Sequence, residues 1–178
     1  MNEKQSHDPE FGSTLSFISK KTNSNPMNLI AYLKQKKVWF NVIEKESTVH
    51  TADAAAKVGL PLERVTKSLV FLADGSPIIA VVPGNCRVNK SKLKEALSAK
   101  DVSLVPFEQA EKYSGYPPGA TPPVNHKNVK KVVIDQGVMG FETVFGGGGS
   151  RRKLIELKPE DIQRLNNAIV ADIAEVIG

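Results

Sequence analysis

The amino-acid sequence predicts an α+β fold, a single domain in which helices flank a mixed, mostly antiparallel β-sheet or barrel. Three observations favour this class. A β-hairpin pattern occupies residues 65–82, short strand candidates separated by turns follow it, and strands and helices do not alternate regularly as in a doubly wound parallel sheet. The length of 178 residues suits one domain of ordinary size.

The composition is that of a globular protein, with 40% hydrophobic and 24% charged residues. Residues 1–26 are polar and lack apolar periodicity, so we expect a disordered leader or a cloning-derived extension there, with the domain formed by residues 27–178. No apolar run is long enough to span a membrane, no secretory signal is recognisable, and the lone Cys86 cannot form an internal disulfide. These features predict a cytoplasmic protein.

Two helices and a strand are expected before the hairpin. Asn28 and Thr51 are suited to cap the helices, and Gly59 is a natural stop for the second one. In order, we expect a helix from residue 29 to about 37, a strand at 38–43, a helix at 52–58 and a short turn from Pro61 to about Arg64.

The hairpin itself is predicted by two runs rich in β-branched and aromatic residues around the turn Asp74-Gly75. Lys67 opens the first run. Because strand side chains alternate between faces, Lys67 points the same way as Leu69 and Phe71. Its ammonium group either enters an apolar cleft or reaches solvent at the strand start, and the second case is the commoner one for a lysine. The hairpin alone therefore assigns no function to Lys67.

The chain after the hairpin predicts helices and short strands around a stiff loop. Asn89 or Ser91 caps a helix, and four prolines with two glycines between Gly115 and Pro123 exclude both helix and central strand. The expected elements are a turn at 83–85, a helix to about residue 98, a strand at 102–105, a helix at 106–113 and strands at 131–134, 142–145 and 154–157. A last helix is expected from Pro159, with an apolar stripe at Ile162, Leu165, Ile169, Ile173 and Val176.

The net charge is +5, and the excess of basic residues is concentrated in two stretches. Such stretches suit a polyanion such as nucleic acid, although a charge of this size also serves solubility alone. The first stretch contains Arg87, Lys90, Lys92, Lys94 and Lys100; the second contains Lys127, Lys130, Lys131, Arg151, Arg152 and Lys153.

Few residues have the spacing of a known catalytic or metal site. His7, His50 and His126 lack metal-ligand spacing, Cys86 has no orienting base, and no serine–histidine–acid order suggests a triad. For His50 and His126 a surface or packing role is favoured over a place in a cleft. The glycines at 146–149 offer bare backbone amides to a phosphate, but they match no phosphate-binding motif, and a flexible hairpin loop is the commoner case.

Three separated motifs together resemble the YbaK/ProX family of aminoacyl-tRNA editing domains. The first is VTKSLVF at residues 65–71, which contains Lys67. The second is Gly115-Tyr116 followed by GATPP at 119–123, and the third is the glycine turn that leads into LIEL at 154–157. The resemblance extends from about Met27 to the C-terminus.

The resemblance implies an α+β editing domain that acts in trans and hydrolyses the ester joining a small noncognate amino acid to tRNA, commonly the tRNA for proline. It implies no cofactor and no metal. The family's lysine falls on Lys67 as catalytic residue, and the substrate-binding positions fall on Gly119, Ala120, Thr121, Pro122, Pro123, Gly147, Gly148 and Gly149. The family often has serine where this chain has Gly147. We expect Arg151, Arg152 and Lys153 to hold the tRNA acceptor end.

On this hypothesis Lys67 anchors the terminal nucleotide or polarises the ester carbonyl. Amides of residues 119–123, in the proline-rich loop at 115–123 (the proline loop), orient the carbonyl and water. An aminoacyl ester is already activated and the substrate's ribose hydroxyl can position water, so no protein nucleophile is needed. Two alternatives are a non-catalytic module that binds tRNA or an aminoacyl-tRNA synthetase, and a hydrolase of small-molecule esters.

Overall fold

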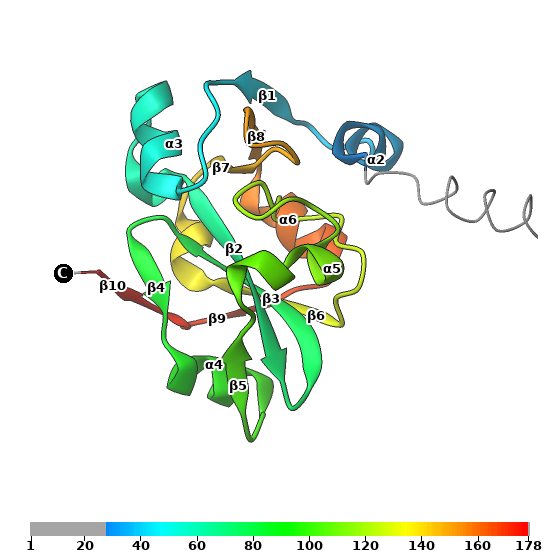
Figure 1. The fold of residues 1–178 in the computed structure, drawn as a ribbon, viewed down its shortest axis with the longest axis vertical. Helices are drawn as coiled ribbons and strands as arrows, with labels where there is room; N and C mark the ends of the chain where they lie inside the picture. The colour runs from blue at the N-terminus through cyan, green and yellow to red at the C-terminus, as the bar shows by residue number, and fades with distance from the viewer. Residues whose placement is uncertain (1–27, 178) are drawn as a thin grey trace, which may run out of the picture.

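The computed structural model describes residues 28–177, and the expected leader at residues 1–26 lies outside that part of the chain (Figure 1). Within it there are five α-helices, three short 3-10 helices and ten strands. The strands form three sheets. The α+β class is confirmed. The sheets do not close on themselves, so the barrel alternative is wrong.

The largest sheet has the order β5-β2-β3-β6-β9, and its centre is the expected hairpin. Strands β2 (Thr66–Ala73) and β3 (Ser76–Pro83) pair antiparallel along their full length. Asp74 and Gly75 both have positive φ, 47° and 81°, as the tight hairpin turn requires. Beside β2 lies the short antiparallel β5 (Val102–Leu104). On the other side, β6 (Lys131–Asp135) pairs parallel with β3, and β9 (Ile169–Ala171) pairs parallel with β6.

Two smaller antiparallel sheets complete the strands. One has the order β1-β8-β7, and in the other β10 pairs with β4. The β1-β8-β7 sheet is joined to the large sheet by one parallel bridge, between Val65 and Phe145. The bounds are β1 (Asn41–Glu44), β4 (Cys86–Val88), β7 (Val144–Gly147), β8 (Lys153–Leu157) and β10 (Ala174–Val176).

The helices expected at residues 29–37, 52–58 and up to about 98 form within one residue of those bounds, whereas the helix expected at 106–113 is divided into a 3-10 turn and a four-residue helix. Asn28 accepts a hydrogen bond from the Ala31 N–H, and Asn89 accepts one from the Lys92 N–H, each at 3.0 Å. Thr51 is the first helical residue rather than the expected cap, and His50 takes the cap position without a side-chain bond. The helices are α2 (Leu29–Lys36), α3 (Thr51–Val58), α4 (Lys90–Leu97), α5 (Glu111–Ser114) and α6 (Pro159–Asn166), with 3-10 turns η1 (Leu62–Arg64), η2 (Phe107–Gln109) and η3 (Gln136–Gly140).

The expectation of one long C-terminal helix is wrong. Helix α6 ends at Asn166, where Asn167 adopts the left-handed conformation (φ 48°), and the chain continues as β9 and β10. The buried Asp135 carboxylate fixes the connection between these strands by accepting the N–H groups of Ile173 and Ala174, at 2.9 and 3.0 Å. The apolar stripe thus combines a helical face with strand residues that happen to continue its spacing.

The large sheet separates two hydrophobic cores because its strand side chains alternate. One face, with Val70 and Ile79, packs against α2, α6 and the β1-β8-β7 sheet; the other, with Phe71 and Ile78, packs against α4. A third cluster holds α3 against the junction of the two sheets, through Ala54, Ala55, Val65, Phe145 and Leu154. This junction positions the candidate site.

Candidate active site

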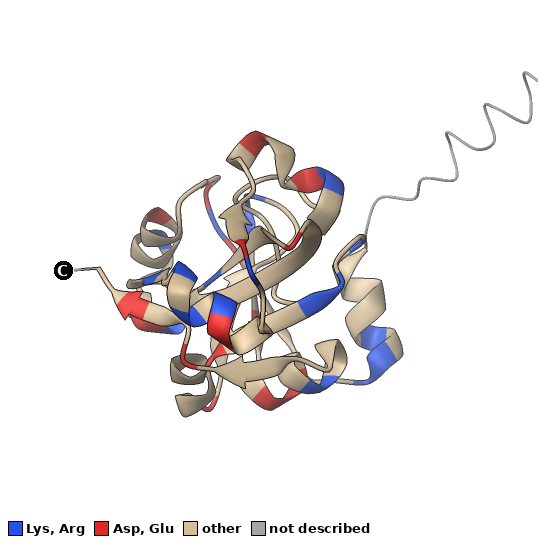
Figure 2. Ribbon diagram, turned by 90° about the horizontal axis from the view of Figure 1, so that it is seen from below, with Lys and Arg blue, Asp and Glu red and all other residues tan. Residues whose placement is uncertain are grey.

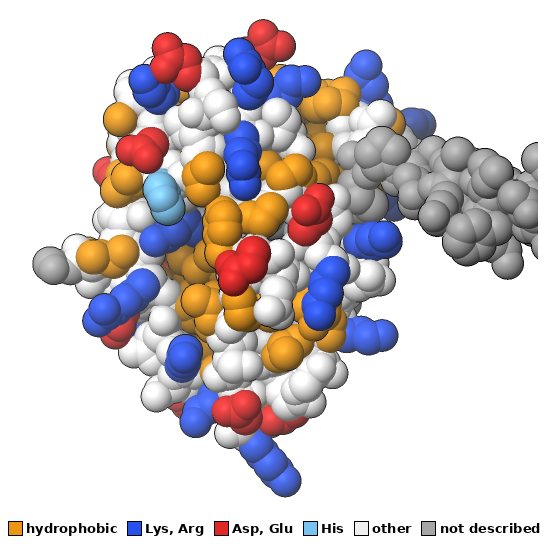
Figure 3. All heavy atoms as spheres, in the orientation of Figure 1, with side chains coloured by type: hydrophobic (Ala, Val, Ile, Leu, Met, Phe, Trp, Pro, Cys, Tyr) orange, Lys and Arg blue, Asp and Glu red, His pale blue; other side chains and the backbone are white. Residues whose placement is uncertain are grey.

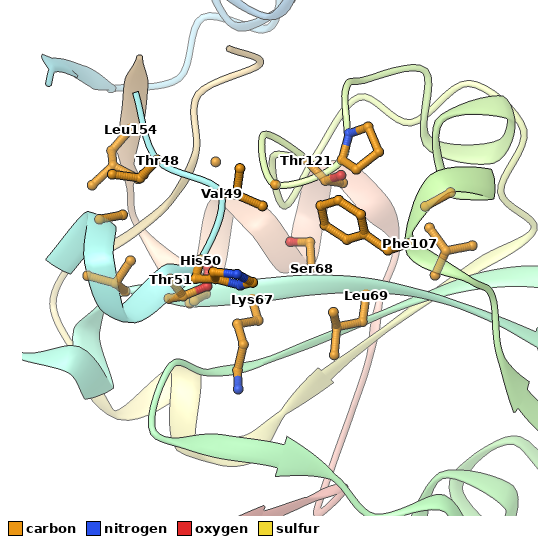
Figure 4. Close-up of a pocket in the computed structure, with 18 of the residues that line it drawn as sticks. Thr48, Val49, His50, Thr51, Lys67, Ser68, Leu69, Phe107, Thr121 and Leu154 are labelled. Atoms are coloured by element: carbon orange, nitrogen blue, oxygen red, sulfur yellow. The ribbon is translucent and has the colours of Figure 1, made fainter. Parts of the chain in front are cut away.

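A cavity of about 270 Å³ opens beside the N-terminal half of β2 (Figure 4). Its walls come from β2, the segment before α3, the segment from β5 to η2, the proline loop and the start of β8. Three lysines and no acidic residue line it. The lining residues are Lys45, Thr48, Val49, His50, Thr51, Ala54, Val65, Thr66, Lys67, Ser68, Leu69, Val70, Leu104, Val105, Phe107, Ala110, Pro118, Gly119, Thr121, Gly147, Lys153 and Leu154.

The cavity lies along an edge of β2 that no strand covers. Strand β3 pairs with the whole of β2 on the other edge, whereas β5 pairs only with the residues from Phe71 to Ala73. One further bond, from the Val105 N–H to the Val70 carbonyl (3.0 Å), extends this cover. Beyond it, as far as the Val65–Phe145 bridge, the edge faces the cavity.

Lys67 and Ser68 leave β2 on opposite sides, with Ser68 on the side of Thr121 and Phe107 (Figure 4). Lys67 is half-buried, and this burial lowers the pKa of its ammonium, an effect that the nearby Cys86 opposes. Within residues 28–177 no ion pair holds Lys67. Ser68 Oγ is buried and is the one buried side-chain oxygen or nitrogen in that range without a hydrogen-bond partner. Neither polar group therefore has a side-chain partner among residues 28–177.

The proline loop and the glycine turn meet in direct contact. The Gly149 N–H donates to the Ala120 carbonyl (3.0 Å), and Arg151 Nε donates to the Pro118 carbonyl (2.9 Å). A β-carbon on Gly147 would lie 2.4 Å from the Thr121 carbonyl oxygen. Glycine is thus required for this approach, and the serine that the resembling family often has here would find no room for its β-carbon.

The segment before α3 closes the cavity on another side. Gly119, with φ 84°, packs so tightly on it that an added β-carbon would lie 2.7 Å from the Val49 carbonyl oxygen. Lys45 Nζ donates to Thr48 Oγ1 (2.6 Å) and to the Arg151 carbonyl, and burial lowers the pKa of Lys45. These contacts fix the wall in place without any helix or strand.

Five of the residues predicted from the resemblance line the cavity: Lys67, Gly119, Thr121, Gly147 and Lys153. The others lie behind or beside it. Ala120, Pro122 and Pro123 are buried, Gly148 and Gly149 belong to the turn, Arg151 is engaged with Pro118, and Arg152 is exposed. Their roles in catalysis or binding stay predictions.

Several lining residues were missed in the sequence. Lys45 and Phe107 belong to no motif, and His50, for which the sequence favours a surface or packing role, is exposed and lines this cavity. Phe107 is 50% exposed beside Leu104, which is 52% exposed. A large exposed apolar pair at a cavity is a structural signal, since exposure cannot be read from the residue types alone.

The back of the proline loop is held by His126. Its Nε2 lies 2.7 Å from the Pro122 carbonyl oxygen, which makes Nε2 the protonated nitrogen of a neutral ring. Burial lowers the pKa of His126 from 6.5 to about 4. His126 is therefore a neutral anchor of the loop at neutral pH.

This anchor predicts a pH dependence of stability. The unfolded chain takes up a proton that the buried imidazole rejects, so the free energy of unfolding falls as pH is lowered from 6.5 to about 4. His126→Gln keeps a donor for Pro122 but cannot titrate, and it should show a smaller loss over the same interval. Urea unfolding of both proteins at pH 7 and pH 4.5 measures the difference. Equal losses would contradict the assignment.

Basic residues occur on several elements and are interspersed with acidic ones (Figure 2). Part of the first basic stretch is neutralised, since Lys92 pairs with Asp172 at 2.9 Å and Arg87 pairs with Glu175. On the face seen in Figure 3, hydrophobic side chains gather across the middle, with basic side chains beside them. Two residues of the first stretch, Arg87 and Lys92, thus already have acidic partners.

Among residues 28–177, no group of three or more His, Cys, Asp or Glu side chains is arranged to hold a metal ion. No helix in the described part of the chain combines the length and apolar character needed to cross a bilayer.

Comparison with known proteins finds relatives whose names refer to the deacylation or charging of tRNA. The proposed Cys-tRNA(Pro)/Cys-tRNA(Cys) deacylase EbsC of Enterococcus faecalis is 27% identical over 160 residues, which cover 88% of this chain and 98% of EbsC. The proline–tRNA ligase of Nitratidesulfovibrio vulgaris is 38% identical over 92 residues, 51% of this chain but only 16% of the ligase. The chain therefore matches a small part of that ligase and nearly all of EbsC.

A solved structure shares the fold. The crystal structure of a candidate trans-editing enzyme for prolyl tRNA synthetase matches with a TM-score of 0.69 and 28% sequence identity, over 76% of this chain and 87% of that one. The sequence profile of the aminoacyl-tRNA editing domain matches residues 44–165, more than half of the chain. The chain belongs to the aminoacyl-tRNA editing domain family, of the YbaK/ProX type.

Proposed function

We propose that this protein is a trans-acting aminoacyl-tRNA deacylase, which hydrolyses the ester of a small noncognate amino acid on tRNA, with the tRNA for proline as its carrier. The observation that carries the proposal is the single cavity shared by Lys67, Gly119, Thr121 and Gly147 in a chain of the editing-domain family. The names of EbsC and of the trans-editing enzyme support the choice of tRNA.

The lining of the cavity supports an anionic, phosphate-bearing substrate. Lys45, Lys67 and Lys153 line it without any acidic residue, so the terminal phosphates of a tRNA would enter a positive field. Because Lys67 leaves β2 on the side opposite Ser68, its position fits a role in anchoring the terminal nucleotide better than contact with the ester carbonyl. The substrate's ribose hydroxyl then positions the water.

The tight contact of the two loops supports selection of small side chains. Gly147 lies against the backbone of Thr121, and Gly119 lies against the backbone of Val49, each too closely for the wall to yield to a larger group. A rigid wall rejects a larger amino acid by steric overlap. This discrimination is stronger than that against an amino acid lacking one methylene, which is worth only about 1 to 3 kcal/mol.

The decisive experiment is a panel of tRNA(Pro) molecules charged with alanine, cysteine, serine, threonine or proline, scored for loss of the ester. The proposal expects rapid deacylation of at least one small noncognate amino acid and none of proline. Binding of the charged tRNAs without hydrolysis would support a non-catalytic module instead. Turnover of simple amino-acid esters without tRNA would support a small-molecule hydrolase.

Salt dependence tests the tRNA contacts separately. If exposed Arg152 contacts a phosphate, Arg152→Ala should weaken binding and reduce the slope of log kcat/KM against log salt by about 1. Lys100→Ala is the matched control, because the Lys100 N–H bonds to Asp74 at the turn end of β2, remote from the cavity. An unchanged slope for Arg152→Ala would remove Arg152 from the interface.

A further inference from the structure

The uncovered edge of β2 presents the main chain of Ser68 to the cavity. Alternate residues of a strand direct their N–H and C=O groups to the same edge. The Val70 carbonyl accepts from Val105 on the β5 side, so the N–H and C=O of Ser68, two residues earlier, point to that side as well. No strand pairs with Ser68 there, and Ser68 lines the cavity.

The hydroxyl of Ser68 is a second, independent signal at the same place. A buried hydroxyl without a partner is costly, and Ser68 Oγ is the one such side-chain atom in residues 28–177. It lies on the side of β2 that carries Thr121 and Phe107 (Figure 4). Among residues 28–177 no group supplies its partner, which leaves the hydroxyl for a molecule bound beside Ser68.

An aminoacyl group carries the same pair of polar groups as a strand residue that would pair with Ser68. In a hydrogen-bonded antiparallel pair, one residue's N–H and C=O exchange both bonds with the residue opposite, and the two side chains lie on the same face. The α-ammonium and ester carbonyl of an aminoacyl-tRNA stand on one carbon as in such a residue. The amino acid's side chain would then lie beside Ser68 Oγ.

We propose that Ser68 recognises the amino acid as one added residue of the sheet: its C=O accepts from the α-ammonium, its N–H donates to the ester carbonyl, and its hydroxyl bonds to a hydroxyl on the substrate's side chain. This inference rests on the proposed function and names its preferred substrate class. Serine is favoured over alanine, although both fit. The main-chain contacts are common to all L-amino acids, so only the hydroxyl distinguishes among the small ones.

Binding of stable analogues tests this without hydrolysis. The probes are 3′-amino-3′-deoxyadenosines that carry seryl, alanyl or propionyl groups in amide linkage, measured by calorimetry. Wild type should bind the seryl probe about 5- to 10-fold more tightly than the alanyl probe. The propionyl probe lacks the α-ammonium, so it should bind more than about 10-fold more weakly than the alanyl probe. Ser68→Ala should abolish the first difference and keep the second.

Two variants complete the test. Ser68→Pro removes the N–H that faces the cavity but no bond to β3, as is tolerated on an uncovered edge, and should weaken all probes. Ser103→Ala, at an exposed position of β5, is the matched control and should bind like wild type. If Ser68→Pro does not fold, the propionyl probe still measures the main-chain contact.

The proposal is overturned if the propionyl probe binds as tightly as the alanyl one, if Ser68→Ala keeps the preference for serine, or if no probe binds. The predicted order of binding without deacylation of any charged tRNA would instead contradict the proposed function and leave the recognition by Ser68 intact.

Discussion

Replacement of Gly147 by alanine is expected to cause the largest combined loss of stability and activity in this protein. The new β-carbon would lie 2.4 Å from the Thr121 carbonyl oxygen and 2.7 Å from the Ala120 carbonyl carbon. Both are backbone atoms and cannot rotate away, so the glycine turn and the proline loop must separate. We expect a loss of about 3 kcal/mol in the free energy of unfolding. Because Gly147 and Thr121 both line the cavity, deacylation should fall at least about 100-fold.

Gly140→Ala is the matched control for this substitution. A β-carbon at Gly140 would meet nothing within 4 Å, and its φ is not in the left-handed region. Its stability should stay within about 0.5 kcal/mol of wild type, with unchanged deacylation. Urea unfolding and initial rates on one mischarged tRNA measure both quantities. A Gly147→Ala protein that matches Gly140→Ala in both would show that the loops need not touch.

The parts of the fold that could be predicted are those with a local physical cause. Asp74-Gly75 permits the positive φ angles of a two-residue turn, and Asn28 and Asn89 place an acceptor at a helix start. Each signal acts within four residues of chain. Hence the hairpin and the first turns of the helices could be predicted from the sequence.

The parts that could not be predicted depend on distant partners. Ile169 and Ile173 continue the helical spacing of α6, but β9 pairs with β6 and the buried Asp135 carboxylate fixes the following turn. The candidate site behaves likewise. The resemblance located Lys67, Gly119 and Gly147, whereas the uncovered edge at Ser68 exists only because β5 is short.

Replacement of Lys67 by methionine is expected to separate activity from stability. The half-buried ammonium of Lys67 has no ion pair in residues 28–177, so its partial desolvation destabilises the folded protein. Methionine has a side chain of similar length without the charge, and it removes this cost. Tm at pH 7 should be equal to or higher than that of wild type. If Lys67 anchors the terminal nucleotide, kcat/KM on a mischarged tRNA should fall about 100-fold or more. Thermal unfolding and single-substrate kinetics measure the two effects.

The lowered pKa of Lys67 also fixes the direction of a pH effect. Below its folded pKa, Lys67 is charged in both states and the cost of burial is fully present. As pH rises through the folded pKa toward the ordinary value of 10.5, the folded protein releases a proton first and the cost fades. The stability advantage of Lys67→Met should therefore shrink as pH rises.

Lys100, which lies beside the turn that follows β2, gives the control: Lys100→Met should change neither stability nor activity. A Lys67→Met protein with the wild-type deacylation rate would exclude Lys67 from catalysis, and a lower Tm would show that its charge supports the fold.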